Sequence, residues 1–225
     1  MTLRAFLLGV FSVIAFHVVI LFCGAGSFIW KEAWLCLISF TIAGTSIAMW
    51  LKRQNANLLR GHLTFWKPNE HTQNKAIIII GVLVYGAFLF IAGIDAVRWQ
   101  YSDVPEVLKA IGFGMLVISY MISFRAIKEN AFLTRTIDIQ HERGQRVITT
   151  GPYSVVRHPL YAAGILSCVS LSIALGSLLG LLPAAGLAIL LAIRITIEER
   201  RLRKGFEGYE EYARIVRYRL FPGLW

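Results

Sequence analysis

The chain has 225 residues, of which 56% are hydrophobic and 16% charged, and its mean hydropathy is +0.62. A soluble domain carries about a quarter charged residues, so this composition excludes one soluble domain as well as a disordered chain, and it indicates an integral membrane protein. The formal net charge of +10 would suit nucleic acid, but in a membrane protein such an excess marks cytoplasmic loops, and we predict no nucleic-acid partner.

Six apolar segments are candidates for membrane-spanning helices, which need about 20 residues to cross the hydrocarbon core. The last segment is short for a full crossing, and only residues 176–180 separate it from the fifth, so we predict that the two form a tight helical hairpin. The predicted fold is therefore all-α, a polytopic integral membrane helix bundle. The six segments are residues 5–29, 33–51, 76–97, 107–127, 160–177 and 181–193.

The distribution of basic residues predicts the orientation of this bundle. If the N-terminus is cytoplasmic, 20 of the 23 Lys and Arg residues fall in internal segments, and only Lys31, Arg98 and Lys109 fall in external loops. This bias is typical of multi-pass proteins with both termini in the cytoplasm. The first segment could instead be a cleaved signal peptide, but its apolar stretch exceeds the roughly 7 to 15 residues of a signal sequence.

The two parts of this single integral domain differ in chemistry. Residues 1–127 form a four-span scaffold, in which we expect His17 to hydrogen-bond a neighbouring helix, and Asp95 and Arg98 to reach the membrane interface at a span end. Residues 128–225 contain a long polar connection before the hairpin and polar stretches after it. Connections of this length are usually functional.

No metal site or disulfide framework is predicted. The three cysteines, Cys23, Cys36 and Cys168, lie singly in apolar runs with no CxxC pair, and buried free thiols are the expected reading. The histidines and acids also lack a ligand spacing.

Polar and aromatic residues gather just before the fifth segment. Pro159 fits the first turn of a helix, and it restricts His158 to an extended backbone, so the chain arrives straight and then turns into the membrane. We expect the free backbone amides of the first helical turn to lie at the cytoplasmic end of the fifth segment, which we call the mouth of this span. We also expect a turn at residues 151–152 beside it. Arg and Tyr at a span end are also ordinary topology features. The side chains expected there are Tyr153, Arg157, His158 and Tyr161.

Two adjacent carboxylates, Glu198 and Glu199, follow the sixth segment, where such a pair is costly near lipid unless a cation compensates it. Arg194 lies one helical turn earlier and shares a helix face with Glu198. A plain surface pair is one reading. Because the hairpin returns this face to the mouth before the fifth span, the pattern also predicts one site with both charge signs, which suits a ligand with an ammonium, a carboxylate and a flat ring.

Charges and aromatics continue with helical spacing from residue 198 to residue 218. An apolar stripe on this stretch consists of Leu202, Phe206, Tyr209 and Tyr212. We therefore predict a cytoplasmic amphipathic C-terminal helix, which lies on the membrane surface or covers the site.

These motifs resemble those of one enzyme family. The string Gly151-Pro-Tyr-Ser-Val-Val-Arg-His-Pro-Leu-Tyr161 precedes the hairpin, and Glu198-Glu199, Tyr209, Tyr212 and a closing Arg-Leu-Phe-Pro222 follow it. Together they resemble the isoprenylcysteine carboxyl methyltransferase family and the related phospholipid methyltransferases. The similarity covers residues 130–225, whereas the first four spans match that family only in number and topology.

The resemblance implies a membrane enzyme that transfers a methyl group from S-adenosylmethionine, enclosed between the hairpin and the C-terminal segment. Eukaryotic members carry His and Thr at the positions of Gln145 and Arg146, and Ser at that of Leu160. The implied cofactor contacts are Gln140, Gln145, Arg146, Val147, Ile148, Tyr153, His158, Pro159, Leu160, Tyr161 and Glu198.

The predicted catalytic residues are Arg194, Glu199 and Arg157. Arg194 resembles the family's arginine beside the reacting carboxylate, and Glu198, with Glu199 as a second candidate, would bind the ammonium of the cofactor. A carboxylate is already ionised at neutral pH, so its methylation needs no base, and positioning dominates.

Three functions agree with this pattern to different degrees. The first is carboxyl methylation of an isoprenylcysteine-like or other hydrophobic or lipidated substrate. The second is N-methylation of a phospholipid amine, for which an acidic or neutral partner would serve better than Arg194. The third is a non-enzymatic transporter or binding protein, which would need polar residues near the middle of several spans.

Overall fold

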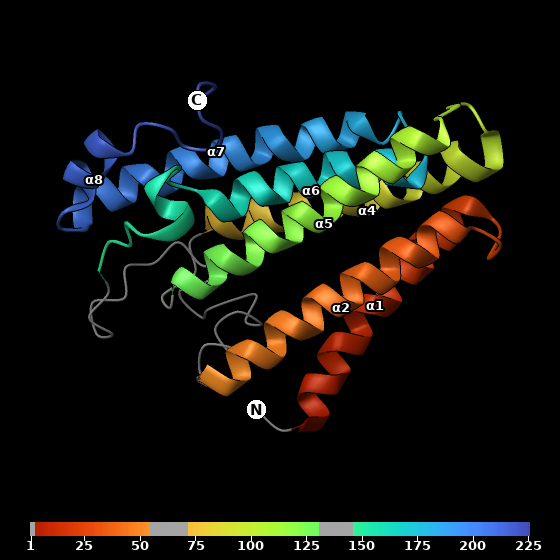
Figure 1. The fold of residues 1–225 in the computed structure, drawn as a ribbon, viewed down its shortest axis with the longest axis horizontal. Coiled ribbons are helices and arrows are strands. Elements are labelled where there is room, and N and C mark those ends of the chain that lie inside the picture. Colours follow the sequence, from red (N-terminus) through yellow and green to blue (C-terminus); the bar gives the residue numbers. More distant parts are fainter. Residues whose placement is uncertain (1–2, 55–71, 131–145) are drawn as a thin grey trace.

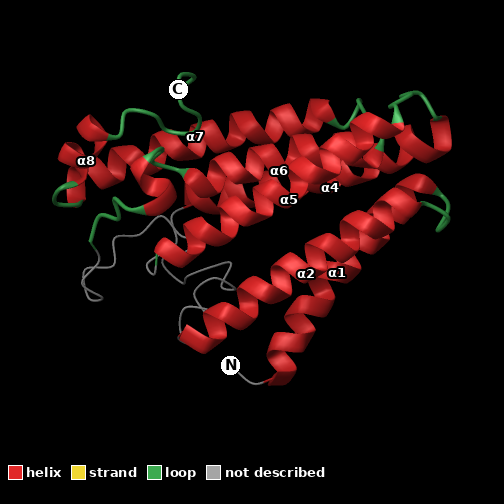
Figure 2. Cartoon of the chain, viewed as in Figure 1, coloured by secondary structure: helices red, strands yellow, loops and turns green. Residues whose placement is uncertain are grey.

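The computed structural model of the protein describes residues 3–54, 72–130 and 146–225, and these form a helical bundle without strands (Figures 1 and 2). Five of the helices are long and apolar enough to cross a membrane, and the predicted all-α membrane bundle is confirmed. In chain order the elements are α1 (Leu3–Ala25), α2 (Lys31–Gln54), α4 (Thr72–Gly93), the π-helix η1 (Ile94–Trp99), α5 (Glu106–Glu129), the 3₁₀-helix η3 (Gly151–Ser154), α6 (Pro159–Leu175), α7 (Leu181–Gly205) and α8 (Tyr209–Ile215).

The predicted hairpin is formed by α6 and α7, but the lengths of its two helices are the reverse of those predicted. α7 has 25 residues, because the helix continues through the polar stretch that follows residue 193, and α6 has only 17. Gly176 ends α6 with a φ of +82°, a left-handed conformation that glycine adopts without steric cost. The apolar run therefore marks the membrane portion of α7 and underestimates the helix.

Successive helices alternate in direction, so that the C-terminal ends of α2, α5 and α7 lie at the same end of the bundle (Figure 1). The N-terminus, the last turns of α2, α5 and α7, and the first turn of α6 lie at one end of the bundle. We call it the basic end, because those last turns carry basic side chains. They are Lys52, Arg53, Lys128, Arg203 and Lys204.

Toward the opposite end, α1 packs closely on α4. A Cβ atom on Gly93 of α4 would lie 2.5 Å from the carbonyl oxygen of Leu21 and 2.6 Å from the backbone nitrogen of Ala25. Glycine at such a crossing lets two helix backbones approach in lipid. From there, α1 runs at an angle to α4, α5, α6 and α7 toward the N-terminus (Figure 1).

His17 also links α1 to α4, as expected from the sequence. Its Nδ1 atom lies 2.7 Å from the carbonyl oxygen of Val13, and its Nε2 atom lies 3.0 Å from the hydroxyl of Tyr85. Because a carbonyl only accepts, the ring proton is on Nδ1, and Nε2 accepts from Tyr85. This histidine therefore has a structural role.

Asp95 does not reach the interface as the sequence suggested, because it is completely buried at the end of the bundle opposite the basic end. Its carboxylate accepts hydrogen bonds from Ser102 through both the amide (3.0 Å) and the hydroxyl (2.7 Å). It also accepts from the Ser177 hydroxyl and the Leu179 amide in the hairpin turn. Donors from two distant segments replace water, so Asp95 fixes the α6–α7 turn to η1.

Candidate functional site

The chain enters the site through η3 and the short segment of residues 155–158. Pro152 occupies the first turn of η3, and Pro159 occupies the first turn of α6. His158 has a φ of −126° and a ψ of +61°, so it lies outside the helical region that a following proline disfavours, although it is not fully extended. The expected turn and the expected entry into α6 are both present.

The backbone just before α6 is paired with the C-terminal tail, residues 216–225. The amide of Arg157 donates to the carbonyl of Tyr218 (3.0 Å), and the amide of His158 donates to that of Arg219 (2.9 Å). The amides of Arg157 and His158 are therefore used within the protein. The tail thus lies against the start of α6 and lines the same place.

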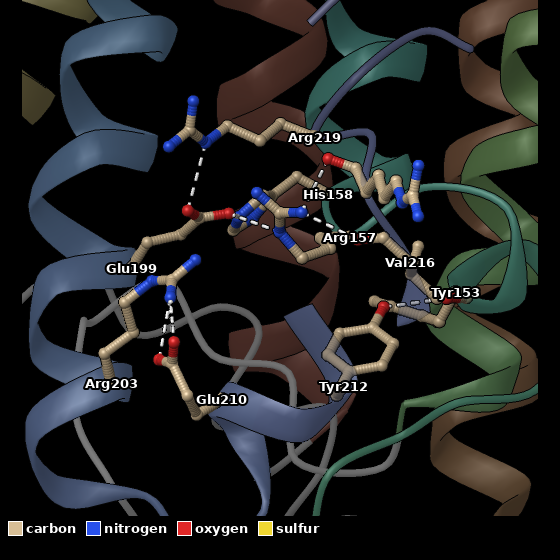
Figure 3. Close-up of polar contacts among 10 residues, drawn as sticks. Tyr153, Arg157, His158, Glu199, Arg203, Glu210, Tyr212, Val216 and Arg219 are labelled. Atoms are coloured by element: carbon tan, nitrogen blue, oxygen red, sulfur yellow. Dashed lines mark hydrogen bonds and ion pairs between the residues drawn. The ribbon is translucent and has the colours of Figure 1, made fainter. Parts of the chain in front are cut away.

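Glu199 is the centre of a buried ionic cluster (Figure 3). Its Oε1 atom accepts from Arg157 Nε at 2.6 Å and from His158 Nε2 at 3.2 Å, and its Oε2 atom accepts from Arg219 Nε at 3.0 Å. The side chains of Arg157 and Glu199 are 4% and 3% exposed. Two guanidinium groups therefore face one carboxylate, which leaves an excess of positive charge.

Arg157 also holds the tail directly. Its Nη1 atom donates to the carbonyl of Val216 at 2.7 Å and to that of Arg217 at 2.8 Å (Figure 3). Charge-assisted hydrogen bonds of this kind are stronger than neutral ones. One side chain therefore joins the α6 entry, α7 and the tail.

A second chain of contacts lies beside the first. Arg194 Nε donates to the Tyr161 hydroxyl at 2.9 Å, and that hydroxyl donates to Glu198 Oε2 at 2.8 Å. The Arg194 guanidinium lies 5.8 Å from the Tyr161 ring centroid, and the His158 ring stacks on Tyr161 at 5.6 Å. Arg194 and Glu198 share a face as expected, and Tyr161 connects them.

The structure thus brings together six of the predicted site residues, four of them charged at neutral pH. They are Arg157, His158, Tyr161, Arg194, Glu198 and Glu199. Sequence reasoning missed Arg219, which also lies over the Trp225 ring at 4.7 Å. Its presence in the closing Arg-Leu-Phe-Pro stretch was the available indication.

Other predicted contacts lie around this centre. Arg146 is exposed, Val147 packs against the buried face of α8, and Ile148 is half-buried. Pro159 is buried, and Leu160 packs toward Leu51 and Ile127, away from the charged side chains. Gln140 and Gln145 lie outside the described residues.

Tyr153 connects η3 to α5 and α8. Its hydroxyl accepts from Asn130 Nδ2 at 3.3 Å, and its carbonyl accepts from the Tyr212 hydroxyl at 2.7 Å. Burial raises the pKa of the Tyr153 hydroxyl to about 12, against the opposing effect of the Asn130 hydrogen bond. The Tyr153 hydroxyl therefore stays protonated and uncharged at neutral pH.

The expected single amphipathic helix over residues 198–218 is interrupted. α7 ends at Gly205, and Gly208, with a φ of +79°, starts the short α8. Leu202, Phe206, Tyr209 and Tyr212 do cluster, as predicted, but Tyr209 and Tyr212 are buried inside the protein. Burial of this apolar stripe therefore holds the C-terminal segment against the site.

Comparison with known proteins gives two curated relatives. Over 118 residues the chain is 34% identical to the cobalt-zinc-cadmium resistance protein CzcN of Cupriavidus metallidurans, covering 52% of this chain and 50% of that protein. Over 77 residues it is 32% identical to the nickel-cobalt-cadmium resistance protein NccN of Alcaligenes xylosoxydans xylosoxydans, covering 34% of this chain and 36% of that protein. The aligned parts span half or less of these relatives.

A family model described as phospholipid methyltransferase matches residues 107–208, which run from α5 through the α6–α7 hairpin to the start of α8. This range contains Arg157, His158, Glu198 and Glu199, and a match to it indicates a membrane methyltransferase. Over residues 107–208 the chain is therefore similar to the phospholipid methyltransferase family, which confirms the resemblance predicted from its motifs.

Proposed function

We propose that the protein transfers a methyl group from S-adenosylmethionine to the carboxylate of a hydrophobic, isoprenylcysteine-like or otherwise lipidated acceptor. The observation that carries the proposal is the Arg194–Tyr161–Glu198 chain of hydrogen bonds at the mouth of α6. It sets a cation and an anion on either side of one hydroxyl. We also propose that the basic end faces the cytoplasm, because the sequence places only three of the 23 basic residues, Lys31, Arg98 and Lys109, in segments predicted to be external.

The two adjacent glutamates differ in their capacity to bind a ligand. Glu199 accepts three hydrogen bonds that involve both of its oxygens. Within the described residues, Glu198 accepts one, from Tyr161. A carboxylate has about four acceptor positions, so Glu198 is the better candidate for the ammonium of the cofactor, and Glu199 is better suited to positioning Arg157 and His158.

Arg194 suits the substrate side of the site. It is buried, its Nε atom donates to the Tyr161 hydroxyl, and the planar fork of a guanidinium matches the geometry of a carboxylate. When bound, S-adenosylmethionine supplies a methyl group on a sulfonium sulfur, and this group moves to a carboxylate oxygen while the broken bond's electron pair stays on sulfur. Arg194 would orient the attacking oxygen, Tyr161 would fix Arg194, and no residue would have to remove a proton.

N-methylation of a phospholipid amine is the second candidate, because the matching family model is described as phospholipid methyltransferase. The attacking nitrogen of an amine acceptor becomes positively charged as it is methylated, so a neighbouring guanidinium would oppose this step. We expect Arg194→Ala to lower carboxyl methylation at least about tenfold, the equivalent of one charge-assisted hydrogen bond, and to spare amine methylation. Incorporation of radiolabelled methyl groups measures both, because base releases the label from a methyl ester as methanol and leaves an N-methyl group intact.

The cofactor site is tested by calorimetry on detergent-purified protein. We expect Glu198→Ala to weaken S-adenosylmethionine binding at least about tenfold, because the ammonium loses an ionised partner. Glu210→Ala is the matched control, since Glu210 pairs with Arg203 on the surface, and it should bind like wild type. Folded wild-type protein that does not bind S-adenosylmethionine would contradict both methyltransferase functions.

A further inference from the structure

Tyr209 and Tyr212 lie one helical turn apart on α8, and their hydroxyl groups differ in hydrogen bonding. Tyr212 donates its hydroxyl hydrogen bond to the Tyr153 carbonyl at 2.7 Å, and the two rings of Tyr209 and Tyr212 pack edge to face at 5.8 Å. Tyr209 is 5% exposed, and its buried hydroxyl has no hydrogen-bond partner among the described residues. Buried hydroxyls are nearly always satisfied, so an exception in a site needs a reason.

The unpartnered hydroxyl lies within the field of the candidate site. Burial, and then the negative charge of Glu199, raise the pKa of Tyr209 well above its usual value, whereas the positive charge of Arg157 acts in the opposite direction. The charge of Glu198 acts on the hydroxyl as well. Tyr209 therefore remains protonated at neutral pH, and its hydroxyl is a buried hydrogen-bond donor on which the charges of both glutamates act.

The Tyr209 hydroxyl is a donor without an acceptor among the described residues, and the neighbouring cluster of Arg157, Glu199 and Arg219 favours an anionic acceptor. Arg157 and Arg219 both donate to Glu199, so two permanent cations face one carboxylate. An incoming carboxylate would balance that excess and satisfy the hydroxyl at once. A second cation in the same place would increase the imbalance.

We propose that Tyr209 is a further ligand-binding residue, whose hydroxyl donates to the carboxylate of the cofactor's amino-acid part. The inference rests on the proposed function, in which Glu198 holds the ammonium of the same group. Tyr209 would then bind the carboxylate of this amino-acid part, and Glu198 would bind its ammonium. The α8 helix, at the far side of the Gly208 turn, therefore contributes to the cofactor site.

The test compares two single-atom changes in the protein and one change in the ligand. Tyr209→Phe and Tyr212→Phe each remove one hydroxyl, and decarboxylated S-adenosylmethionine lacks only the carboxylate. Affinities are measured by calorimetry on detergent-purified protein, with displacement of radiolabelled S-adenosylmethionine as the second measurement. Thermal unfolding of each ligand-free variant reports on the fold.

We expect Tyr209→Phe to bind S-adenosylmethionine about tenfold more weakly than wild type, since one hydrogen bond to a charged group is lost. Binding of the decarboxylated compound and the unfolding temperature should not fall. Tyr212→Phe should instead lower the unfolding temperature, because its hydroxyl is already used inside the protein.

Unchanged affinity of Tyr209→Phe for S-adenosylmethionine, or an equal loss for both ligands, would overturn the assignment to the carboxylate. Absence of S-adenosylmethionine binding by the wild type is a separate outcome, because it would remove the proposed function itself. The two failures are therefore distinguishable in one set of titrations.

Discussion

Arg157→Ala is expected to destabilise the protein by about 3–5 kcal/mol, the usual cost of breaking a buried ion pair by removing one partner. The Arg157 and Glu199 side chains are almost completely buried, and Nε and Oε1 are 2.6 Å apart. The same guanidinium holds the carbonyls of Val216 and Arg217, so the tail loses an anchor as well. Thermal unfolding of the detergent-purified protein measures the first effect, and limited proteolysis beyond Gly205 measures the second.

Two further variants separate this effect from a general loss of charge. Arg203 and Glu210 form an exposed ion pair at 2.7 Å, and Arg203→Ala should cost only ~0–1 kcal/mol. Arg157→Ala combined with Glu199→Ala should be less damaging than Arg157→Ala alone, because the carboxylate that lost its most buried partner is removed as well. A double variant as unstable as the single one would show that the buried carboxylate is not the source of the cost.

Asp95→Ala is expected to be the second strongly destabilising substitution, on the order of 3 kcal/mol, because each buried donor left unsatisfied costs about 1–3 kcal/mol. The Ser177 hydroxyl and the Leu179 amide would lose their acceptor, and Ser102 would lose two hydrogen bonds. The turn between α6 and α7 would then be released from η1. A lower unfolding temperature and faster amide hydrogen exchange at residues 176–180 are the measurements.

Thr41→Ala is the matched control for a polar contact in a span. The Thr41 hydroxyl donates only to the Leu37 carbonyl of its own helix, whose backbone hydrogen bond remains, so its loss should change the unfolding temperature little. Asp95→Asn keeps the size of the side chain and should fall between the two, because one oxygen can still accept. If Asp95→Ala were no more harmful than Thr41→Ala, water at the membrane surface would be satisfying these donors.

The spans and the candidate site were predictable for local reasons. Apolar runs identify membrane helices because lipid offers no partner to an exposed backbone. Pro159 after His158 predicts a helix start from backbone sterics alone, and the spacing of Arg194 and Glu198 predicts a shared helix face. These inferences need only neighbouring residues.

Contacts between distant segments could not be predicted in this way. The pairing of Arg219 with Glu199 joins the tail to α7, and the backbone bonds of residues 157–158 with residues 218–219 depend on how the tail folds back. A position such as that of Asp95 at a span end is equally compatible with solvent exposure. Its burial involves a contact with Ser177 in the distant turn between α6 and α7. The break at Gly208 interrupts a stripe whose spacing was continuous.

The pairing of the tail with the entry to α6 has a consequence for the order of events during synthesis. The described helices that are long and apolar enough to cross a membrane end by Gly205, but Glu199 acquires its third donor only from Arg219. Chains emerge from the ribosome N-terminus first, at about 5–20 residues per second. The bundle can therefore insert before the ionic cluster is complete, and the newborn protein completes the candidate site only after residue 219 has left the exit tunnel.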